Sequence, residues 1–253
     1  MIILNFQLSI HMNHNTITPY QSQDSKKEQV TQMFDNIAPT YDKLNRIMSA
    51  GIDISWRRKA VKLLAKYNPQ ICADIATGTG DFAIELLRLN PKKVIGIDIS
   101  PQMLQVGIEK MKARKIEHIV EMQVGDSENL NLADNSIDVI TVGFGVRNFQ
   151  DLKKGLGEIL RVLRPGGALA VLEPSSPTYF PLKQLFHIHF HILTPWVGKM
   201  LSGDDSAYKY LPDSVGAFPN GQEFLDICAE VGFKNGIYKP LTFGTCAMYI
   251  LEK

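Results

Sequence analysis

The sequence predicts an α/β protein with a parallel sheet, and three observations support this prediction. Hydrophobic residues make up 45% of the chain and charged residues 21%, values typical of a globular protein rather than a disordered or fibrous one. The 253 residues suffice for one well-buried core, although two smaller domains would also fit. Beyond residue 70, short apolar runs alternate with amphipathic stretches, which indicates βαβ units with right-handed crossovers.

Composition and charge exclude several classes of protein. A formal net charge of +1 gives no general field that would attract nucleic acid, so no nucleic-acid partner is expected. Cys72, Cys228 and Cys246 form no Cys-x-x-Cys pair, which argues against a disulfide framework and a zinc site and favours a reducing, cytoplasmic compartment. The apolar start "MIILNFQLSI" lacks the basic flank and cleavage site of a signal peptide, and the chain has no run of 18 uncharged apolar residues that would span a membrane.

The first expected elements are an extension and a helix. Residues 11–29 are rich in Asn, Thr, Gln, Ser and Lys, so we expect 1–30 to be a mobile extension and 31–253 to be one folded domain. After Ser55, a candidate N-cap, the apolar residues Trp56, Ala60, Leu63, Leu64 and Tyr67 recur at helical spacing. The other face carries the basic residues Arg57, Arg58, Lys59, Lys62 and Lys66. We interpret it as a solvated face, with anionic lipid heads as the alternative partner.

The predicted strands follow an Asn-Pro break at 68–69. Their ranges are 71–76, 93–97, 119–124, 137–142, 168–172, 234–238 and 245–251, and a helix is expected near 221–229. Ligands of open α/β sheets bind outside the carboxyl ends of the strands. The long apolar and aromatic segment 177–217 interrupts the alternation, and we expect it to form a lid over that edge of the sheet.

A glycine turn, "ADIATGTGDFA" at residues 73–83, follows the first predicted strand. Gly78 and Gly80 allow a ligand to approach the backbone closely, and the helix that begins there offers free N–H groups. Asp98 ends the next apolar run, about 20 residues further on, where a carboxylate can accept hydrogen bonds from both hydroxyls of a ribose. The turn therefore predicts a ligand that contains adenosine, such as a nicotinamide dinucleotide or S-adenosylmethionine.

Charge around the turn favours S-adenosylmethionine. Asp74 and Asp81 bracket the glycines, and their negative charge would repel a pyrophosphate but attract an ammonium or sulfonium group. Asp126 and Ser127 follow the third predicted strand, where a side chain could meet the exocyclic amine of adenine.

The nicotinamide alternative depends on the pair Tyr179 and Lys183, which resembles a short-chain dehydrogenase dyad. Pro181 lies between them, where that dyad needs a continuous helix. We therefore prefer the methyl donor.

Five segments of the chain resemble a known family. They are "FDNIAPTYDKLNRIMSAGIDISWR", "DIATGTGD", "VGFGVRNF", "RVLRPGGALAVLEPS" and "YKYLPDSV". Together they are similar to the quinone-biosynthesis C-methyltransferases that act on demethylmenaquinone and on the ubiquinone precursor. The resemblance runs from about Phe34 to the C-terminus. Asp53 stands where the common pattern has His, and Arg164 replaces the usual Lys before Pro165.

The resemblance implies a Rossmann-like class I methyltransferase with a seven-stranded, mostly parallel sheet, an antiparallel last strand and an α-helical lid insertion. It implies methyl transfer from S-adenosylmethionine to a ring carbon of a prenylated demethylmenaquinol in menaquinone biosynthesis. The ubiquinone-precursor enzyme and a non-catalytic S-adenosylmethionine-binding subunit of a quinone-synthesis assembly stay open as alternatives. A homodimer and a peripheral contact at the inner face of the membrane are also open.

The expected donor-binding residues combine the turn with the family pattern. The resemblance implies donor contacts from Thr79, Asp98, Asp126 and Ser127. The full expected set is Asp74, Thr77, Gly78, Thr79, Gly80, Asp98, Ile99, Asp126, Ser127 and Gly143.

Methylation of a ring carbon requires an electron-rich ring, so the site must favour a phenolate over a phenol. Arg147, directly beyond the fourth predicted strand, is the leading candidate for stabilising that oxyanion. A guanidinium stays protonated, so a water held by Arg147 and Asn148 is the candidate base. An Arg-Asn pair that only fixes the loop is the alternative. The loop lacks the (Asp/Asn)-Pro-Pro-(Tyr/Phe) pattern of many nitrogen methyltransferases, which favours a carbon or oxygen acceptor.

Several further side chains could handle the acceptor. Tyr41 and Tyr208, with Asp42 and Tyr210, are candidates for orienting the quinol, whereas Glu173 is interpreted as structural. No metal is expected at His187, His189 and His191, because no carboxylate or Cys stands at ligand spacing nearby, and His191 as a proton acceptor is the alternative role. The apolar residues around these histidines could form a groove for the prenyl chain.

Overall fold

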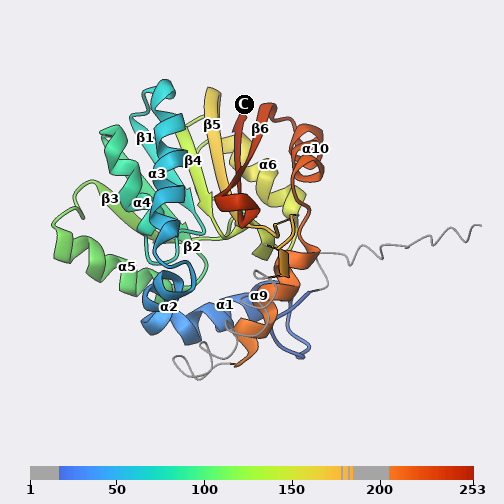
Figure 1. Cartoon of the computed structure of the whole chain (residues 1–253). Coiled ribbons are helices and arrows are strands. Elements are labelled where there is room, and N and C mark those ends of the chain that lie inside the picture. The colour runs from blue at the N-terminus through green and yellow to red at the C-terminus, as the bar shows by residue number, and fades with distance from the viewer. Residues whose placement is uncertain (1–16, 178, 182, 185–204) are drawn as a thin grey trace, which may run out of the picture.

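The computed structural model describes residues 17–177, 179–181, 183–184 and 205–253 of the chain (Figure 1). Its centre is a seven-stranded sheet with the order β3-β2-β1-β4-β5-β7-β6. Among these strands only β7 runs antiparallel to its neighbours, β5 and β6. This arrangement confirms the predicted α/β class and the seven-stranded, mostly parallel sheet.

All seven predicted strands are present. Their bounds are β1 Ile71–Ile75, β2 Lys93–Asp98, β3 Val120–Val124, β4 Ile137–Gly143, β5 Leu163–Pro174, β6 Lys234–Leu241 and β7 Cys246–Glu252. β5 is longer than the apolar run at 168–172, because it also pairs with β4 through Leu163 and Ile137, beyond a shift in register. The inner strands are continuous apolar runs because helices cover both of their faces.

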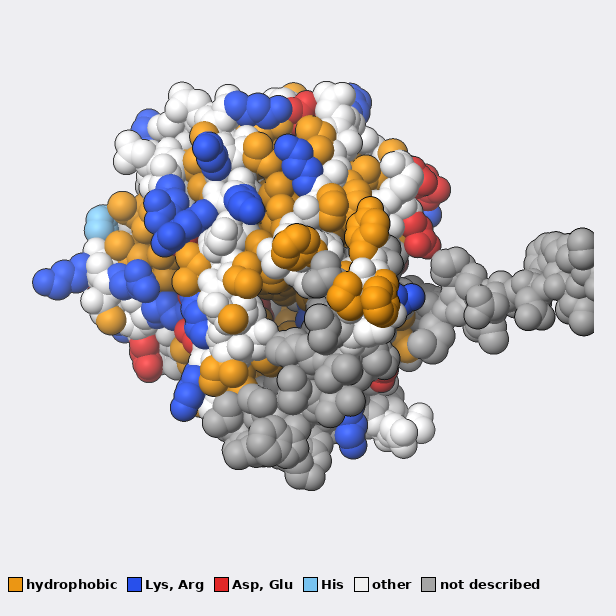
Figure 2. Space-filling model, in the orientation of Figure 1, with side chains coloured by type: hydrophobic (Ala, Val, Ile, Leu, Met, Phe, Trp, Pro, Cys, Tyr) orange, Lys and Arg blue, Asp and Glu red, His pale blue; other side chains and the backbone are white. Residues whose placement is uncertain are grey.

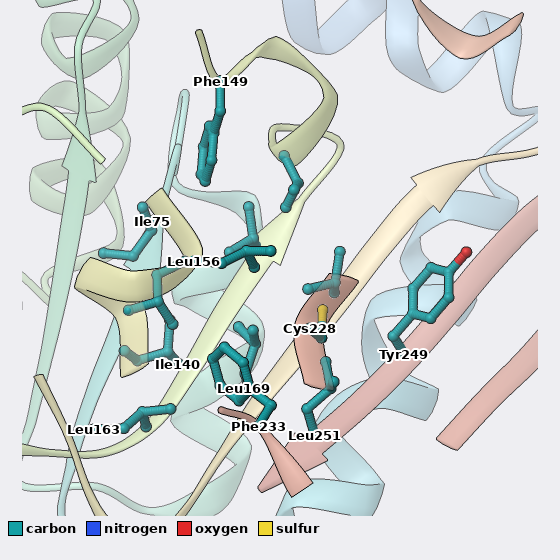
Figure 3. Packing of buried hydrophobic residues seen from close by; sticks show 14 of the residues in the cluster. Ile75, Ile140, Phe149, Leu156, Leu163, Leu169, Cys228, Phe233, Tyr249 and Leu251 are labelled. Atoms are coloured by element: carbon teal, nitrogen blue, oxygen red, sulfur yellow. The ribbon is translucent and has the colours of Figure 1, made fainter. Parts of the chain in front are cut away.

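Helices cover the two faces of the sheet and one of its ends. Their bounds are α1 Lys26–Ile37, α2 Tyr41–Met48, α3 Ile52–Leu64, α4 Asp81–Leu86, α5 Pro101–Arg114, α6 Leu152–Val162, α9 Asp205–Ala217 and α10 Gln222–Val231. Short 3₁₀ turns are η2 Ala38–Thr40, η3 Ala65–Tyr67, η4 Leu87–Leu89, η5 Val146–Asn148 and η7 Thr242–Gly244. α6 and α10 pack on one face around Leu156, Cys228 and Tyr249 (Figure 3), and α3 and α4 pack on the other around Trp56 and Phe82.

A third apolar cluster joins α1, α2, α5 and α9. Its buried members include Val30, Met33, Leu44, Met103 and Tyr210. α1, α2 and α9 lie together at one end of the sheet (Figure 1). We call α1, α2 and α9 the helical cap. It lies at the end of the sheet where β2 and β3 are followed by polar residues. Of the expected lid at 177–217, most residues between 178 and 204 lie outside the described part of the chain, so the lid stays a prediction.

α1 begins inside the segment that we expected to be mobile up to residue 30. Ser25 caps it: its hydroxyl accepts from the Glu28 N–H at 3.3 Å, and the Glu28 carboxylate accepts from the Ser25 N–H at 2.8 Å. Val30 is buried in the third cluster. The sequence carried this signal, since Ser-x-x-Glu before an apolar run is a capping box.

Replacing Ser25 by Ala is expected to lower the free energy of unfolding by about 1 kcal/mol, because the Glu28 N–H at the start of α1 loses its side-chain acceptor. Denaturant unfolding measures the change, and Ser25→Thr, which keeps the hydroxyl, serves as the control. An equal loss for both variants would show that the cap does not stabilise α1.

α3 also differs from its prediction. It begins at Ile52 rather than after Ser55, because Gly51 adopts a left-handed conformation with φ of 74° and ends the preceding turn. Arg57 is buried rather than solvated and pairs with Asp53, whereas the other basic residues of the predicted face are exposed.

None of the helices in the described parts of the chain is apolar over enough length to cross a membrane.

Candidate active site

The two glycines of the turn after β1 have different surroundings and so different structural roles. Both lie in the left-handed region, with φ of 55° at Gly78 and 84° at Gly80. A Cβ on Gly80 would clash with the methyl group of Met111 in α5, so this glycine permits close helix packing. A Cβ on Gly78 would lie 3.8 Å from the Tyr41 ring, which is ordinary contact. Gly78 therefore faces the space beside the turn and Gly80 faces α5.

Asp98, at the end of β2, is bound to this turn. Its carboxylate accepts from the Gly78 N–H at 2.7 Å and from the Ser100 N–H at 2.9 Å. Burial raises the pKa of Asp98 to about 6, while these backbone donors act to lower it. Each carboxylate oxygen has a second lone pair, so Asp98 can still accept hydrogen bonds from a ligand.

Asp74 holds the turn through hydrogen bonds from the protein's own donors. One oxygen accepts from the Thr141 hydroxyl at 2.6 Å, and the other accepts from the Thr77 hydroxyl at 2.6 Å and the Ala83 N–H at 3.1 Å. Burial raises the pKa of Asp74 to about 6, against the effect of the hydroxyls. Its oxygens are thus occupied by the protein's own donors.

Asp81 and Thr79 belong to an ion-pair network. Asp81 pairs with Arg46 at 2.7 Å and with Lys110 at 2.9 Å. Burial would raise the pKa of Asp81, but these cations hold it below its usual value. The Thr79 hydroxyl donates to Asp42 at 2.6 Å and accepts from Lys110 at 2.9 Å. Asp81 is therefore already paired with two cations, whereas Asp74 is bonded only to neutral donors. The attraction of a sulfonium by these two carboxylates stays a prediction.

A cleft beside the turn brings most of the expected donor-binding residues together. We call it the turn cleft; it has a volume of about 70 Å³, and its wall includes Gly78, Asp98, Ile99, Asp126, Ser127, Gly143 and Asn148. A smaller adjoining hollow is lined by Asp74, Thr77 and Thr79. Gly80 lines neither.

α1 closes the turn cleft on one side. The Lys27 ammonium lies 2.6 Å from the Asp126 carboxylate and 3.3 Å from that of Glu128. Partial burial would lower the pKa of Lys27, but these two carboxylates raise it. Lys27 is therefore bound to Asp126, the residue whose carboxylate we expected to contact adenine.

A larger and mainly apolar cavity lies between the helical cap and the sheet. We call it the apolar cavity; its volume is about 390 Å³. Its wall includes Met33, Ile37, Leu44, Met48, Ile52, Trp56 and Leu211, with the polar side chains of Asn45, Asp53, Arg57, Arg147 and Tyr210. A cavity of this size is typical of a small-molecule site.

Arg147 lines the apolar cavity and is held rigidly. Its Nη1 donates to the Glu173 carboxylate at 3.0 Å and to the Phe144 carbonyl, and its Nε donates to the Ser214 hydroxyl at 3.4 Å. Among the described residues its Nη2 has no hydrogen-bond partner. Glu173 is fully buried, and burial raises its pKa while Arg147 opposes the shift. Glu173 is thus the fixed counter-ion of this arginine.

The neighbouring Asn148 belongs to the other space. Its side chain lines the turn cleft, and its amide oxygen accepts from the Tyr210 hydroxyl at 3.0 Å. Burial raises the pKa of Tyr210 to about 12, so this phenol remains a hydrogen-bond donor. Arg147 and Asn148 line different spaces, and the water expected between them stays a prediction.

The remaining sequence candidates are only partly described. Tyr208 lies in the first turn of α9, but its side chain lies outside the described residues, as do His187, His189 and His191. In the described ranges no group of three His, Cys, Asp or Glu side chains could hold a metal ion.

Three residues form part of the wall of both spaces: Phe34, Tyr41 and Phe144. The rings of Phe34 and Tyr41 meet edge to face with centroids 6.0 Å apart. Sequence reasoning singled out only Tyr41. Phe34 and Phe144 lie in segments that carried the family resemblance, but an aromatic residue in a bare sequence is indistinguishable from core.

Comparison with known proteins places the chain in a family. A model of the ubiE/COQ5 methyltransferase family matches residues 22–253. The chain is 49% identical over 238 residues to the demethylmenaquinone methyltransferase of Bacteroides fragilis, with 94% of this chain and 97% of that protein covered. It is 46% identical to the ubiquinone/menaquinone biosynthesis C-methyltransferase UbiE of Geotalea daltonii, with 90% and 97% covered.

A solved structure shares the fold. It is a SAM-dependent methyltransferase from Thermotoga maritima, which aligns with a TM-score of 0.59 and 21% identity over 88% of this chain and 99% of that one. The predicted fold, the methyltransferase class and the S-adenosylmethionine donor agree with these findings. The chain belongs to the ubiE/COQ5 methyltransferase family.

Proposed function

We propose that this chain transfers a methyl group from S-adenosylmethionine to a ring carbon of a prenylated demethylmenaquinol. The observation that carries the proposal is the meeting of the apolar cavity with the turn cleft at shared walls. A prenylated ring needs an apolar cavity, and its reacting carbon needs access to the methyl donor. The name of the Bacteroides fragilis relative supports demethylmenaquinone as the precursor, and that of the Geotalea daltonii relative keeps the ubiquinone precursor as the alternative.

The residues of the turn cleft suit the methyl donor. Two carboxylates line the cleft at the ends of neighbouring strands: Asp98 ends β2, and Asp126 follows β3. Asp98 can accept hydrogen bonds from the two ribose hydroxyls, and Asp126 can accept one from the exocyclic amine of adenine. Gly78 offers close backbone approach beside them. We propose that these residues, with Ile99, Ser127 and Gly143, hold the donor, and that Asp74, Thr77, Thr79 and Gly80 shape the turn. When bound, S-adenosylmethionine would supply a methyl group from a positively charged sulfur and become a neutral thioether, while the methylated ring carbon loses its proton to water.

The acceptor ring would lie in the apolar cavity beside Arg147. We propose that Arg147 Nη2 donates a hydrogen bond to the acceptor's phenolate oxygen, because its other donors are already engaged. A charge-assisted bond of this kind favours the ionised ring and so raises electron density at the neighbouring carbon. We assign Tyr41 and Tyr210, which line the cavity, to orienting the ring, and Tyr208 stays a candidate for the same role.

The direct test combines labelled S-adenosylmethionine, a short-chain demethylmenaquinol and the purified protein. Label in the ring is the expected result, and a prenylated benzoquinol is offered in parallel to decide between the two precursors. Label in the benzoquinol alone would establish the ubiquinone alternative. Donor binding without label in either ring would leave a non-catalytic binding subunit.

Replacing Lys27 by Met is expected to raise the affinity for S-adenosylmethionine about two- to fivefold. A partly exposed ion pair is worth up to about 1 kcal/mol, and Lys27, which lines the turn cleft and is paired with Asp126, must move aside when the donor enters. The turn cleft is also smaller than the roughly 300 Å³ of an ordinary ligand pocket, so α1 must yield on binding. Calorimetric titration measures the change, with exposed Lys59 to Met as the control. A weaker affinity would show that Lys27 helps to hold the donor.

We also propose that residues 177–217 cover the site and that the cavity opens toward the inner face of a membrane. Ile52 lines the cavity and is 40% exposed, and Phe243, next to the cavity-lining Thr242, is 75% exposed. Figure 2 shows hydrophobic side chains beside the grey residues and basic ones over α3. Co-sedimentation with anionic vesicles tests the membrane contact, with Phe243→Ser as the variant. We propose a homodimer as well, and light scattering tests it.

A further inference from the structure

A bound sulfonium would need a partner other than the carboxylates of the turn. Asp74 accepts three hydrogen bonds from protein donors, and Asp81 is paired with Arg46 and Lys110. The charge of Asp81 is therefore balanced by cations, and the oxygens of Asp74 are occupied by neutral donors, before S-adenosylmethionine arrives. Some other feature must favour the positive sulfur where cleft and cavity meet, because the methyl group has to reach the acceptor ring from there.

Among the described residues, those that line both spaces are all aromatic. Phe34 comes from α1, Tyr41 from the first turn of α2, and Phe144 from the loop after β4. Tyr41 and Phe144 also line the small hollow at the glycine turn. The face of an aromatic ring is negative and attracts cations, most strongly where water is excluded. The boundary between donor and acceptor is thus lined by surfaces suited to a positive, weakly hydrated group.

Two of the three rings, those of Phe144 and Tyr41, are held by bonds to their surroundings. Phe144 has φ of 62°, which a side chain larger than glycine rarely adopts, and its N–H donates to the Leu172 carbonyl at 2.7 Å. Arg147 bonds to its carbonyl. Burial raises the pKa of Tyr41, against the effect of its bond to Asn45, so the phenol stays uncharged. Bonds within the protein therefore hold Phe144 and Tyr41 in place before the donor binds.

One cation already lies near this boundary. The Arg57 guanidinium is 5.8 Å from the centroid of the Phe144 ring. Its charge is balanced by the Asp53 carboxylate, to which it is bonded, and by Asp81 at 3.7 Å. Phe34 and Tyr41 have no such cation over their faces among the described residues. They are the rings that are best placed for a second positive group.

Building on the proposed function, we propose that Phe34, Tyr41 and Phe144 form an aromatic junction that binds the charged donor in preference to its neutral product. S-adenosylmethionine carries a sulfonium, whereas S-adenosylhomocysteine carries an uncharged thioether. The rings would contact both ligands but attract only the first electrostatically. The junction thereby sets the ratio of donor to product affinity and favours release of the product.

The test compares dissociation constants of both ligands by calorimetric titration, without any acceptor. Phe34→Leu and Tyr41→Leu remove a ring but keep an apolar side chain. Each is expected to weaken S-adenosylmethionine about fivefold or more and S-adenosylhomocysteine less than about twofold. Phe34→Tyr and Tyr41→Phe, which keep the ring, should preserve the ratio of the two constants. Met48→Leu, in a residue that lines only the apolar cavity, should preserve both constants.

The outcomes separate this inference from the proposed function. Equal weakening of both ligands, or an unchanged ratio in both leucine variants, overturns the junction while leaving donor binding intact. A wild-type protein that binds neither ligand overturns the proposed function together with the junction. Tyr41→Phe also guards against misfolding, since it keeps the packing that Tyr41→Leu alters.

Discussion

Turnover is expected to fall about 10²- to 10³-fold when Arg147 and Glu173 are both replaced by Gln, while the dissociation constant of S-adenosylmethionine changes less than about twofold. Arg147 lines the apolar cavity rather than the turn cleft, so its loss should affect the acceptor and not the donor. Both residues are changed because removing the guanidinium alone would leave a buried carboxylate unpaired, at a cost of about 3–5 kcal/mol.

Two single variants serve as controls for this result. Glu173→Gln keeps the guanidinium but removes its counter-ion, and it should retain more turnover than the double variant. Arg147→Lys keeps the charge but not the planar donor set and should lose much of the turnover. Single-turnover rates and donor titration give the two readouts. Parallel losses of turnover and donor affinity in the double variant would move Arg147 into the donor site.

The second large effect is expected at Asp98. Replacing it by Asn should raise the dissociation constant of S-adenosylmethionine about 10- to 100-fold, because hydrogen bonds from the ribose to a charged acceptor are lost. Wild-type affinity should also fall as the pH drops through about 6, since burial holds the pKa of Asp98 near that value and the protonated carboxyl accepts less well. Above that pH the carboxylate is ionised and the affinity should be constant.

The pH profile distinguishes Asp98 from its neighbour. Asp74 titrates in the same range, where burial also raises its pKa to about 6, but its oxygens serve the turn. Asp98→Asn should therefore flatten most of the profile, and Asp74→Asn should preserve the part that comes from Asp98. An unchanged profile in Asp98→Asn would place the ribose elsewhere.

Most of the fold was predictable because the signals were local. Continuous apolar runs indicated the strands, and Gly78 and Gly80 indicated the turn after β1. The errors at α1 and α3 were errors of boundary: Ser25 and Glu28 formed a capping box that the polar composition around them obscured, and Gly51 ended a turn earlier than Ser55 suggested.

The site was less predictable because its contacts join residues that are far apart in sequence. Residues at strand ends, such as Asp98 and Asp126, could be placed by topology alone. The partners of Asp81 could not, since Arg46 and Lys110 reach it from other helices. Nor could the shared aromatic wall, which requires α1 to fold back beside the loop that carries Phe144. Lys27 was missed for the same reason.

The 3₁₀ turn η5 is held by hydrogen bonds from α1 and from α9, which lie far apart in the sequence. Lys26 of α1 donates to the Arg147 carbonyl, while Ser214 and Tyr210 of α9 hold the side chains of Arg147 and Asn148. α1 contributes to the wall of the turn cleft and α9 to the wall of the apolar cavity, so the helices that line the two spaces also hold Arg147. Any displacement of α1 or α9 would loosen these hydrogen bonds, so the shape of the two spaces is coupled to the placement of the guanidinium.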